Sequence, residues 1–202
     1  MSGSEKSGKK LKLLQYNAPV ILTYTVICGV ALLLNILTHG WTNDNIFSVY
    51  RTRLTDPMQY VRLFSYIFGH ADYSHFISNF TIILLIGPML EEKYGSGQLA
   101  KMMLFTAVIT GLIQVIFFPG TALLGASGIA FMLILLSSFA NYQKGGIPIT
   151  LILVALIYLS GEIADGLFKK DSISQMGHII GGVCGCIFGL TISKSKGSQA
   201  SE

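Results

Sequence analysis

The sequence predicts an all-α polytopic membrane protein, with six transmembrane helices and a membrane-embedded first loop. Hydrophobic residues fill 51% of the 202 positions and charged residues only 12%, whereas about a quarter of the residues in soluble domains are charged. Uncharged runs repeatedly reach about 20 residues, the length that crosses a bilayer as a helix. The basic residues flank these runs, as is typical of the ends of membrane spans.

The charge and cysteine content exclude several other classes of protein. The formal net charge is +4, but the basic residues are distributed between apolar runs and form no patch, so we expect no nucleic-acid partner. Cys28, Cys184 and Cys186 lie inside apolar runs without a paired CxxC motif or interleaved histidines. The pattern therefore predicts neither a disulfide framework nor a zinc site, and no metal or other cofactor is expected.

The N-terminal segment is basic and is followed by an apolar run that is too long for the core of a signal peptide. We therefore expect this run to be retained as the first span. The predicted organisation is a basic cytoplasmic tail at 1–17, a membrane domain at 18–192 and a short cytoplasmic tail at 193–202.

The first span is predicted at residues 18–38, which carry no charge. Residues 39–72 are mixed, since aromatic residues such as Trp41 and Tyr60 alternate with charges such as Arg62. Aromatic rings beside charges suit the bilayer interface, so this segment is predicted to be a loop partly embedded at the headgroup level.

Five further spans follow the loop. The second span is predicted to end at the charged residues Glu91, Glu92 and Lys93, which are followed by a glycine-rich turn signal at 95–97. The uncharged stretch between Lys101 and Lys144 is too long for one crossing, and Pro119 divides it. The predicted ranges are 73–90, 102–118, 124–142, 145–161 and 173–192.

Six crossings place both termini on the same side of the membrane, and the distribution of basic residues predicts which side that is. With cytoplasmic termini, the inner segments carry Lys6, Lys9, Lys10, Lys12, Lys93, Lys101, Lys144, Lys194 and Lys196, and the outer segments carry Arg51, Arg53, Arg62, Lys169 and Lys170. The excess of inner lysines favours cytoplasmic termini, with the plasma membrane as the expected location.

Polar residues within spans are costly and therefore suggest a function. Ser127 lies in the sequence Gly125, Ala126, Ser127, Gly128 at the start of the fourth span. A serine among glycines also promotes close helix packing, and for Ser127 taken alone that is the better explanation.

His178 lies in the sixth span beside a repeat of small residues. Glycine recurs every four residues, at Gly177, Gly181, Gly185 and Gly189. One stripe of the helix is therefore almost without side chains, which lets a neighbouring backbone approach. A large polar ring works against such packing, although a core histidine with one hydrogen bond remains an alternative. Gly182, one turn further on, would leave space over the ring.

His75 and Asn79 are the third polar group, near the outer end of the second span. Their i, i+4 spacing places both side chains on one helix face, where they can direct two donors at one point. Hydrogen bonding between helices would explain the pair equally well. A zinc site with His70 has little support, because no carboxylate ligand accompanies the two histidines.

These four polar residues are predicted to lie at one depth, toward the outer half of the bilayer. A nucleophile, a base and donors for a developing oxyanion are the groups that acyl transfer requires. Ser127 could face His178 if the fourth and sixth spans pack along the glycine stripe. No acidic residue in the spans is placed to orient the histidine, so a dyad is favoured over a triad.

Taken together, these motifs resemble those of the rhomboid family of intramembrane serine proteases. The resemblance rests on HFISN at 75–79, EEKYGSG at 91–97, GASG at 125–128 and GHIIGGVCG at 177–185, which occur in the family's order along most of the chain.

The resemblance implies a helical bundle whose active site lies in a water-filled cavity opening outward. It implies that Ser127 is the nucleophile, that His178 is the base, and that His75, Asn79 and the Ser127 backbone N–H form the oxyanion hole. The implied partners are transmembrane protein substrates within the lipid bilayer, and the implied reaction is endoproteolysis without a cofactor. Arg62 matches an arginine of the family's first loop.

Two positions depart from the family pattern. Val61 stands where a tryptophan usually precedes the arginine, which affects loop anchoring more than chemistry. Phe131, one turn after Ser127, stands where many members have a tyrosine beneath the catalytic imidazole, so stacking is kept and a hydroxyl hydrogen bond is lost.

Two functions from other classes remain open at this point. One is a catalytically silent relative that binds or escorts membrane clients, although such relatives usually lack one dyad residue. The other is a transporter, which has less support because no span carries a buried carboxylate or a pair of broken helices.

Overall fold

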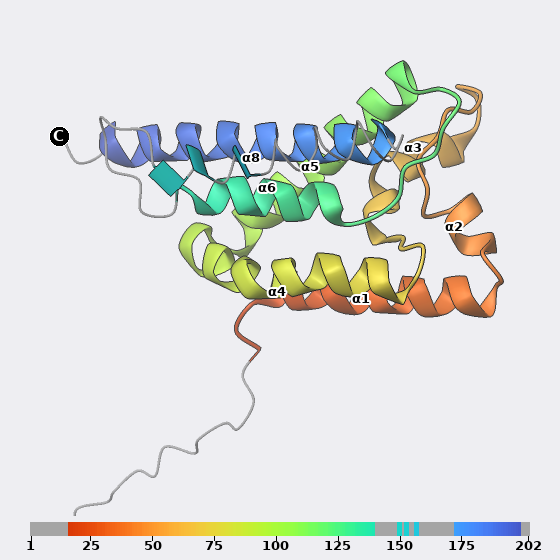
Figure 1. Ribbon diagram of the computed structural model, residues 1–202, viewed down its shortest axis with the longest axis horizontal. Helices are drawn as coiled ribbons and strands as arrows, with labels where there is room; N and C mark the ends of the chain where they lie inside the picture. The colour runs from red at the N-terminus through yellow and green to blue at the C-terminus, as the bar shows by residue number, and fades with distance from the viewer. Residues whose placement is uncertain (1–15, 140–148, 151, 154–155, 158–171, 199–202) are drawn as a thin grey trace, which may run out of the picture.

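The structure, a computed structural model, describes residues 16–139, 149–150, 152–153, 156–157 and 172–198, and this part of the chain is helical with connecting loops (Figure 1). It confirms the predicted all-helical class. The elements are α1 (Pro19–Leu37), α2 (Trp41–Asn45), α3 (Pro57–Ser65), the short 3-10 helix η1 (Tyr66–Phe68), α4 (Tyr73–Tyr94), α5 (Ser96–Phe117), α6 (Ser127–Ser137) and α8 (Ser172–Ser198).

Three helices are long and apolar enough to cross a membrane, namely α1, α4 and α5. They confirm the first three predicted spans. The helix α6 and the apolar part of α8, Gln175–Thr191, are shorter. The predicted fifth span at 145–161 lies outside the described residues except for helical pieces at 149–150, 152–153 and 156–157, so the count of six spans stays a prediction.

The boundary between the second and third spans differs from the prediction. The helix α4 continues through the charged residues to Tyr94, and α5 begins at Ser96, so Gly95 with its φ of 84° separates them. The charges do not end the helix because one of them, Glu91, is turned inward. Its carboxylate accepts hydrogen bonds from the backbone N–H groups of Val20 and Ile21, both at 2.9 Å, and from the Ser96 hydroxyl at 2.7 Å.

Glu91 therefore caps the N-terminus of α1. The first N–H groups of a helix have no partner within the helix, and the helix dipole places partial positive charge there. The Glu91 carboxylate, on a residue that is only 2% exposed, accepts hydrogen bonds from these N–H groups and places a negative charge at the positive end of the dipole. This one side chain of α4 joins the beginnings of α1 and α5 at the same end of the bundle (Figure 1).

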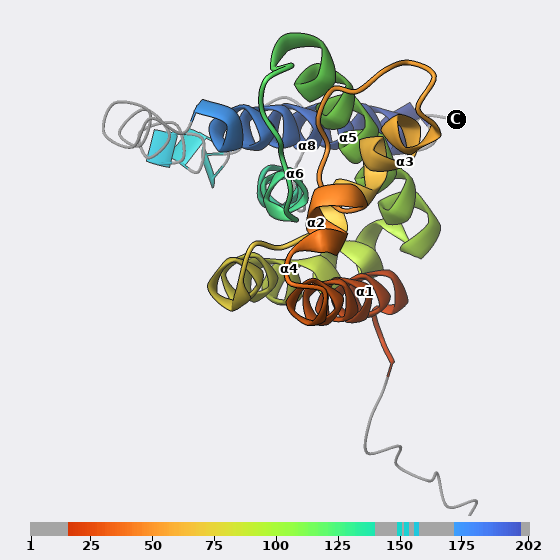
Figure 2. The same ribbon diagram turned by 90° about the vertical axis from the view of Figure 1, so that its right-hand side faces the viewer.

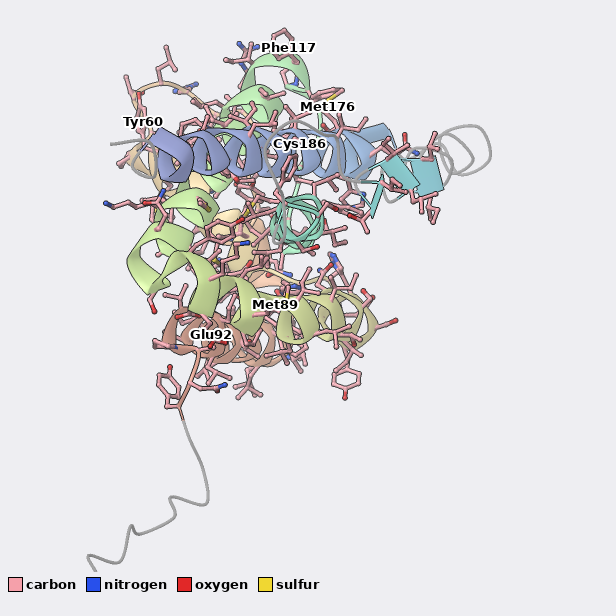
Figure 3. The ribbon with its side chains drawn as sticks, turned by 90° about the vertical axis from the view of Figure 1, so that its left-hand side faces the viewer. Tyr60, Met89, Glu92, Phe117, Met176 and Cys186 are labelled. Atoms are coloured by element: carbon pink, nitrogen blue, oxygen red, sulfur yellow. The ribbon has the colours of Figure 1, made fainter. Side chains whose placement is uncertain are left out.

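The loop between α1 and α4 folds into α2, α3 and η1. Asp56 begins α3, because its carboxylate accepts from the Met58 N–H at 2.9 Å, a bond that lowers the pKa of this exposed carboxyl. Arg62 is buried, and its guanidinium donates to the Asn45 carbonyl at 2.9 Å and lies 4.5 Å from the centre of the Tyr50 ring. Tyr60 lies at the edge of the molecule (Figure 3).

The helix α6 is the centre of the bundle, with α4 on one side and α5 and α8 on the other (Figure 2). Ile129, Ala130, Met132, Leu133 and Leu136 are all at most 1% exposed. The apolar character of α6 is thus used for packing against protein, and the position of its first residue, Ser127, is fixed by contacts on several sides.

The glycine stripe of α8 packs directly on α6. A Cβ atom at Gly181 would overlap the carbonyl oxygen of Gly128, and one at Gly185 would overlap that of Met132. At Gly189 it would overlap the Phe139 ring. The contacts advance in the same order along both helices, so α6 and α8 run parallel and begin at the same end of the bundle (Figure 1).

Candidate active site

The turn that carries Ser127 is held by contacts to the first loop. Leu123 and Val49 exchange two backbone hydrogen bonds, of 2.8 and 2.9 Å, and the Gly125 N–H donates to the Tyr66 carbonyl at 3.0 Å. Ala126 is the N-cap of α6 and Ser127 its first residue. The backbone N–H of Ser127 therefore has no acceptor within the helix and lies at the positive end of its dipole.

His75 and Asn79 lie directly against this turn. A Cβ atom at Gly125 would be 2.8 Å from Cε1 and 2.9 Å from Nε2 of His75, and 3.9 Å from Nδ2 of Asn79. The φ of Gly125 is 125°, so both the backbone and the space require glycine here. The HFISN and GASG motifs, about fifty residues apart in sequence, thus meet with no side chain between them.

The surroundings of His75 indicate which ring nitrogen carries the proton. Asp72 caps α4 by accepting from the His75 backbone N–H at 2.8 Å, and the Ala71 N–H points at His75 Nδ1 at 3.5 Å. A ring nitrogen that faces a donor is the unprotonated one, so the proton is assigned to Nε2. Nε2 is the nitrogen that faces Gly125, so His75 presents a donor toward the turn.

Asn79 presents a second donor. The residue is 6% exposed, and its Nδ2 has no hydrogen-bond partner among the described residues. A buried amide without a partner costs on the order of 1–3 kcal/mol, which is unusual unless the group serves another purpose. The amide lies on the same helix face as His75, as the i, i+4 spacing predicts.

His178 lies on the opposite side of the turn. Its ring is 4.5 Å from that of Phe131, centre to centre, with 41° between the planes. A Cβ atom at Gly128 would lie 3.2 Å from the carbonyl oxygen of Gly177, so α8 is close to α6 next to His178. His178 also lies near enough to His75 for the two rings to interact electrostatically.

The remaining predicted positions lie around this centre. A Cβ atom at Gly182 would meet the Leu135 side chain at 3.7 Å, and one at Gly177 would meet that of Leu123 at 3.5 Å. Arg62 lies in the first loop, where it joins α3 to the last residue of α2, Asn45. Among the described residues no group of three histidines, cysteines or carboxylates could hold a metal ion.

His70 lies next to His75. It is fully buried, its Nδ1 is 3.2 Å from the Phe68 carbonyl, and its ring is 5.1 Å from that of His75, centre to centre. Burial, and to a lesser degree the neighbouring His75, lower the pKa of His70 to about 4. His70 is therefore neutral near pH 7 and adds no charge beside His75.

Sequence reasoning did not find three of the residues that build this site. Asp72 could have been found, because an aspartate three positions before His75 is a common N-cap pattern. Tyr66 and Val49 act through backbone groups on the turn. Backbone contacts of this kind leave no signal in side-chain patterns.

Comparison with known proteins agrees with these motifs. The family model described as the rhomboid domain matches residues 57–195. Rhomboid protease GlpG of Haemophilus influenzae is 23% identical over 181 residues, which cover 88% of this chain and 92% of that protein.

Two longer relatives match a shorter part of the chain. Rhomboid-related protein 1 of Caenorhabditis elegans is 26% identical over 140 residues, covering 65% of this chain and 39% of that protein. Rhomboid-like protein 11, chloroplastic, of Arabidopsis thaliana is 27% identical over 142 residues, covering 63% of this chain and 50% of that protein. The chain thus spans half or less of these two relatives. Because the family model matches more than half of its residues, the chain belongs to the rhomboid family.

Proposed function

We propose that this protein is an intramembrane serine endopeptidase that cleaves transmembrane segments of membrane proteins. The observation that carries the proposal is the convergence of His75, Asn79 and the Ser127 backbone N–H on one turn, with His178 across from it. Donors for a developing oxyanion, beside a nucleophile and a base, are what an acyl-transfer site requires. The Nδ2 atom of Asn79 is buried and has no hydrogen-bond partner among the described residues, so it is available to such an oxyanion.

In the proposed reaction, the Ser127 hydroxyl attacks the substrate carbonyl while His178 takes its proton. The oxyanion that forms accepts hydrogen bonds from the Ser127 N–H, His75 and Asn79. The carbon–nitrogen bond then breaks as His178 returns the proton to the leaving amine, which leaves an acyl ester on Ser127. Water, deprotonated by His178, hydrolyses this ester and restores the hydroxyl.

Phe131 supports the base by ring contact alone, because it has no hydroxyl that could bond to the imidazole. Aromatic contacts of this kind contribute about 0.5–1.5 kcal/mol. The ring lies 4.5 Å from that of His178 and limits its rotation. We propose no cofactor, because the dyad and the three donors complete the acid–base chemistry without one.

The decisive experiment is cleavage of a transmembrane substrate by purified protein reconstituted in liposomes. Ser127→Ala or His178→Ala should abolish cleavage, whereas Ser137→Ala, which changes another serine of α6, should retain it. Ser137 is a suitable control because its hydroxyl bonds to the Ile134 carbonyl of its own helix. Undiminished cleavage by either dyad variant would refute the proposal.

A fluorophosphonate probe tests the same site without a substrate. The wild-type protein should be labelled at Ser127, and Ser127→Ala should not. A folded wild-type protein that neither reacts with the probe nor cleaves any substrate would instead be a silent member of the family that binds membrane clients.

We also propose that the protein lies in the plasma membrane with cytoplasmic termini. The lysine distribution supports this orientation, and the beginning of α1 lies at the opposite end of the bundle from the beginning of α6, whose first residue is Ser127 (Figure 1). A cysteine introduced at Ala122, in the exposed loop before α6, should react with an impermeant reagent added outside the cell. Labelling only after the cells are opened would show that the loop before α6 faces the cytoplasm, which is the opposite orientation.

A further inference from the structure

The Ser127 turn, residues 123–127, is attached to the first loop at two points. Leu123 and Val49 exchange two backbone hydrogen bonds, and the Gly125 N–H donates to the Tyr66 carbonyl at 3.0 Å. These bonds tie the position of the turn to that of the loop. The contacts that hold the loop in the bundle therefore also act on the backbone N–H of Ser127.

The two parts of the loop that provide these attachments are joined to each other. The Ser65 hydroxyl donates to the Ile46 carbonyl, and the Arg62 guanidinium donates to the Asn45 carbonyl at 2.9 Å. The segment that leads to Val49 is thereby bonded to α3, which continues directly into η1. Both attachments of the turn thus belong to one hydrogen-bonded unit.

The side chain of Tyr66 joins this unit to α5. Its hydroxyl donates to the Ala107 carbonyl at 3.1 Å, and the residue is only 3% exposed. A helix carbonyl normally accepts the N–H four residues on and has a second lone pair, which this hydroxyl uses. Tyr66 therefore bonds to α5 through its side chain and to the Ser127 turn through its carbonyl.

A second contact on α5, one turn after Ala107, sets the same separation. A Cβ atom at Gly111 would lie 2.6 Å from the carbonyl oxygen of Leu63 and 3.1 Å from its Cα. Both are backbone atoms of α3, which cannot move aside as the end of a side chain can. The backbone of α3 therefore lies directly on α5 (Figure 2), at a distance at which the Tyr66 hydroxyl reaches its acceptor.

We propose that Tyr66 is a positioning residue of the oxyanion hole, because its hydroxyl fixes the carbonyl that holds Gly125. The inference rests on the proposed function and deepens it. Gly125 leads into the Ser127 N–H and faces the His75 ring, so it lies between two of the proposed donors. Such donors act at about 2.7–3.1 Å from the oxyanion, so a small displacement of the turn weakens them.

The alternative is a purely structural hydrogen bond. A buried tyrosine whose hydroxyl only has a partner contributes to stability, and its loss would leave the chemistry of the folded protein unchanged. Loss of a positioning residue instead lowers kcat while KM stays nearly constant, because the displaced donors act mainly in the transition state. Kinetics and stability measured together therefore separate the two explanations.

The kinetic test compares Tyr66→Phe with Tyr60→Phe in liposomes. Tyr66→Phe removes the hydroxyl and keeps the carbonyl, so a donor is displaced and not lost, and kcat should fall about tenfold with KM changed less than about twofold. Labelling of Ser127 by the fluorophosphonate probe should slow by a similar factor. Tyr60→Phe removes a bond of 2.9 Å to the Leu54 carbonyl elsewhere in the loop and should keep wild-type rates.

A destabilised variant controls for stability. Glu91→Ala loses hydrogen bonds at the opposite end of the bundle. Its folded fraction should cleave at the wild-type rate, so a slow Tyr66→Phe cannot be attributed to lower stability alone. Wild-type kcat in Tyr66→Phe would overturn the inference, even with a lower unfolding temperature, because the bond would then be purely structural.

Hydrogen–deuterium exchange of the peptide that spans 123–128 tests the same link without catalysis. Tyr66→Phe should raise the exchange rate of this peptide severalfold relative to α4, and Tyr60→Phe should not. Gly111→Ala, whose Cβ would press on α3, should act in the same direction. Gly97→Ala is its control on the same helix, because a Cβ atom there meets nothing within 4 Å.

The two measurements distinguish failure of this inference from failure of the proposed function. A lower kcat in Tyr66→Phe without faster exchange at 123–128 would contradict the route through the turn. A wild-type protein that neither cleaves nor reacts with the probe would refute the protease instead. The exchange measurement would then still decide whether the Tyr66 hydroxyl holds the turn.

Discussion

At the scale of single residues, Gly125 has the least freedom to change. Its φ is 125°, and a Cβ atom would be 2.8 Å from the His75 ring. Gly125→Ala should displace this donor and lower the cleavage rate by about 10²-fold or more, the usual effect of losing an oxyanion donor. Cleavage kinetics measure the rate of this variant. Gly120→Ala serves as the control, because a Cβ atom at Gly120 meets nothing within 4 Å. Equal rates for both variants would contradict this assignment.

His70 predicts a dependence of stability on pH. Its pKa is about 4 in the folded protein and about 6.5 when unfolded. Between these values the unfolded state binds more protons, so stability is complete above about pH 6.5 and falls as the pH drops toward 4. The loss should reach at most about 3 kcal/mol.

The measurement is thermal unfolding in detergent between pH 4 and 7. His70→Phe should flatten the profile in this range, whereas His39→Gln, at an exposed position after α1, should leave it unchanged. A profile that His70→Phe does not alter would show that other groups govern the acid sensitivity.

At the scale of elements, the packing of α8 on α6 can be tested at two adjacent glycines. A Cβ atom at Gly181 would overlap the backbone of Gly128, whereas one at Gly182 meets only Leu135 at 3.7 Å. Gly181→Ala should therefore push the helices apart and cost about 1–3 kcal/mol. Gly182→Ala should be neutral or stabilising by up to about 1 kcal/mol, because alanine favours the helix.

Thermal unfolding compares the two glycine variants, and cleavage kinetics add a second readout. Because Gly128 directly follows Ser127, the Gly181 variant should also lose activity. If both variants unfold at the same temperature, the close contact between the helices does not contribute to stability.

The elements also show how far the sequence predicts the structure. Spans one to three follow from uncharged runs, because a helix of that length must avoid charges on every side. The predicted turn at Gly95 is where α4 and α5 meet. The predicted end of the second span at residue 90 was too early, because Glu91 looks like a surface charge until α1 is placed beside it. The fifth span lies outside the described residues and stays a prediction.

The candidate site was predictable in its residue types but not in how it is held. The spacing of His75 and Asn79 predicts one face, and the helix α4 places both toward Gly125. The contact itself depends on hydrogen bonds between the turn and the backbone groups of Val49 and Tyr66. Those partners lie far from the turn in the sequence, and no local pattern identifies them.

At the scale of the whole molecule, Glu91 connects α1, α4 and α5 through three hydrogen bonds of 2.7 to 2.9 Å. Hydrogen bonds to a charged group typically contribute about 1.5–3 kcal/mol each, and the cost of burying the carboxylate offsets part of this. Glu91→Ala should therefore destabilise the protein by about 2–4 kcal/mol.

Glu92 is the matched control, because it is the adjacent acidic residue of α4 and lies at the surface (Figure 3). Glu92→Ala should change stability by no more than about 0.5 kcal/mol. Unfolding in a denaturing detergent series measures both variants. Glu91 lies at the opposite end of α4 from His75, so Glu91→Ala should lower the unfolding temperature while leaving the cleavage rate of the folded fraction near that of wild type. A selective loss of rate without a loss of stability would mean that this end of the bundle acts on the Ser127 turn through α4.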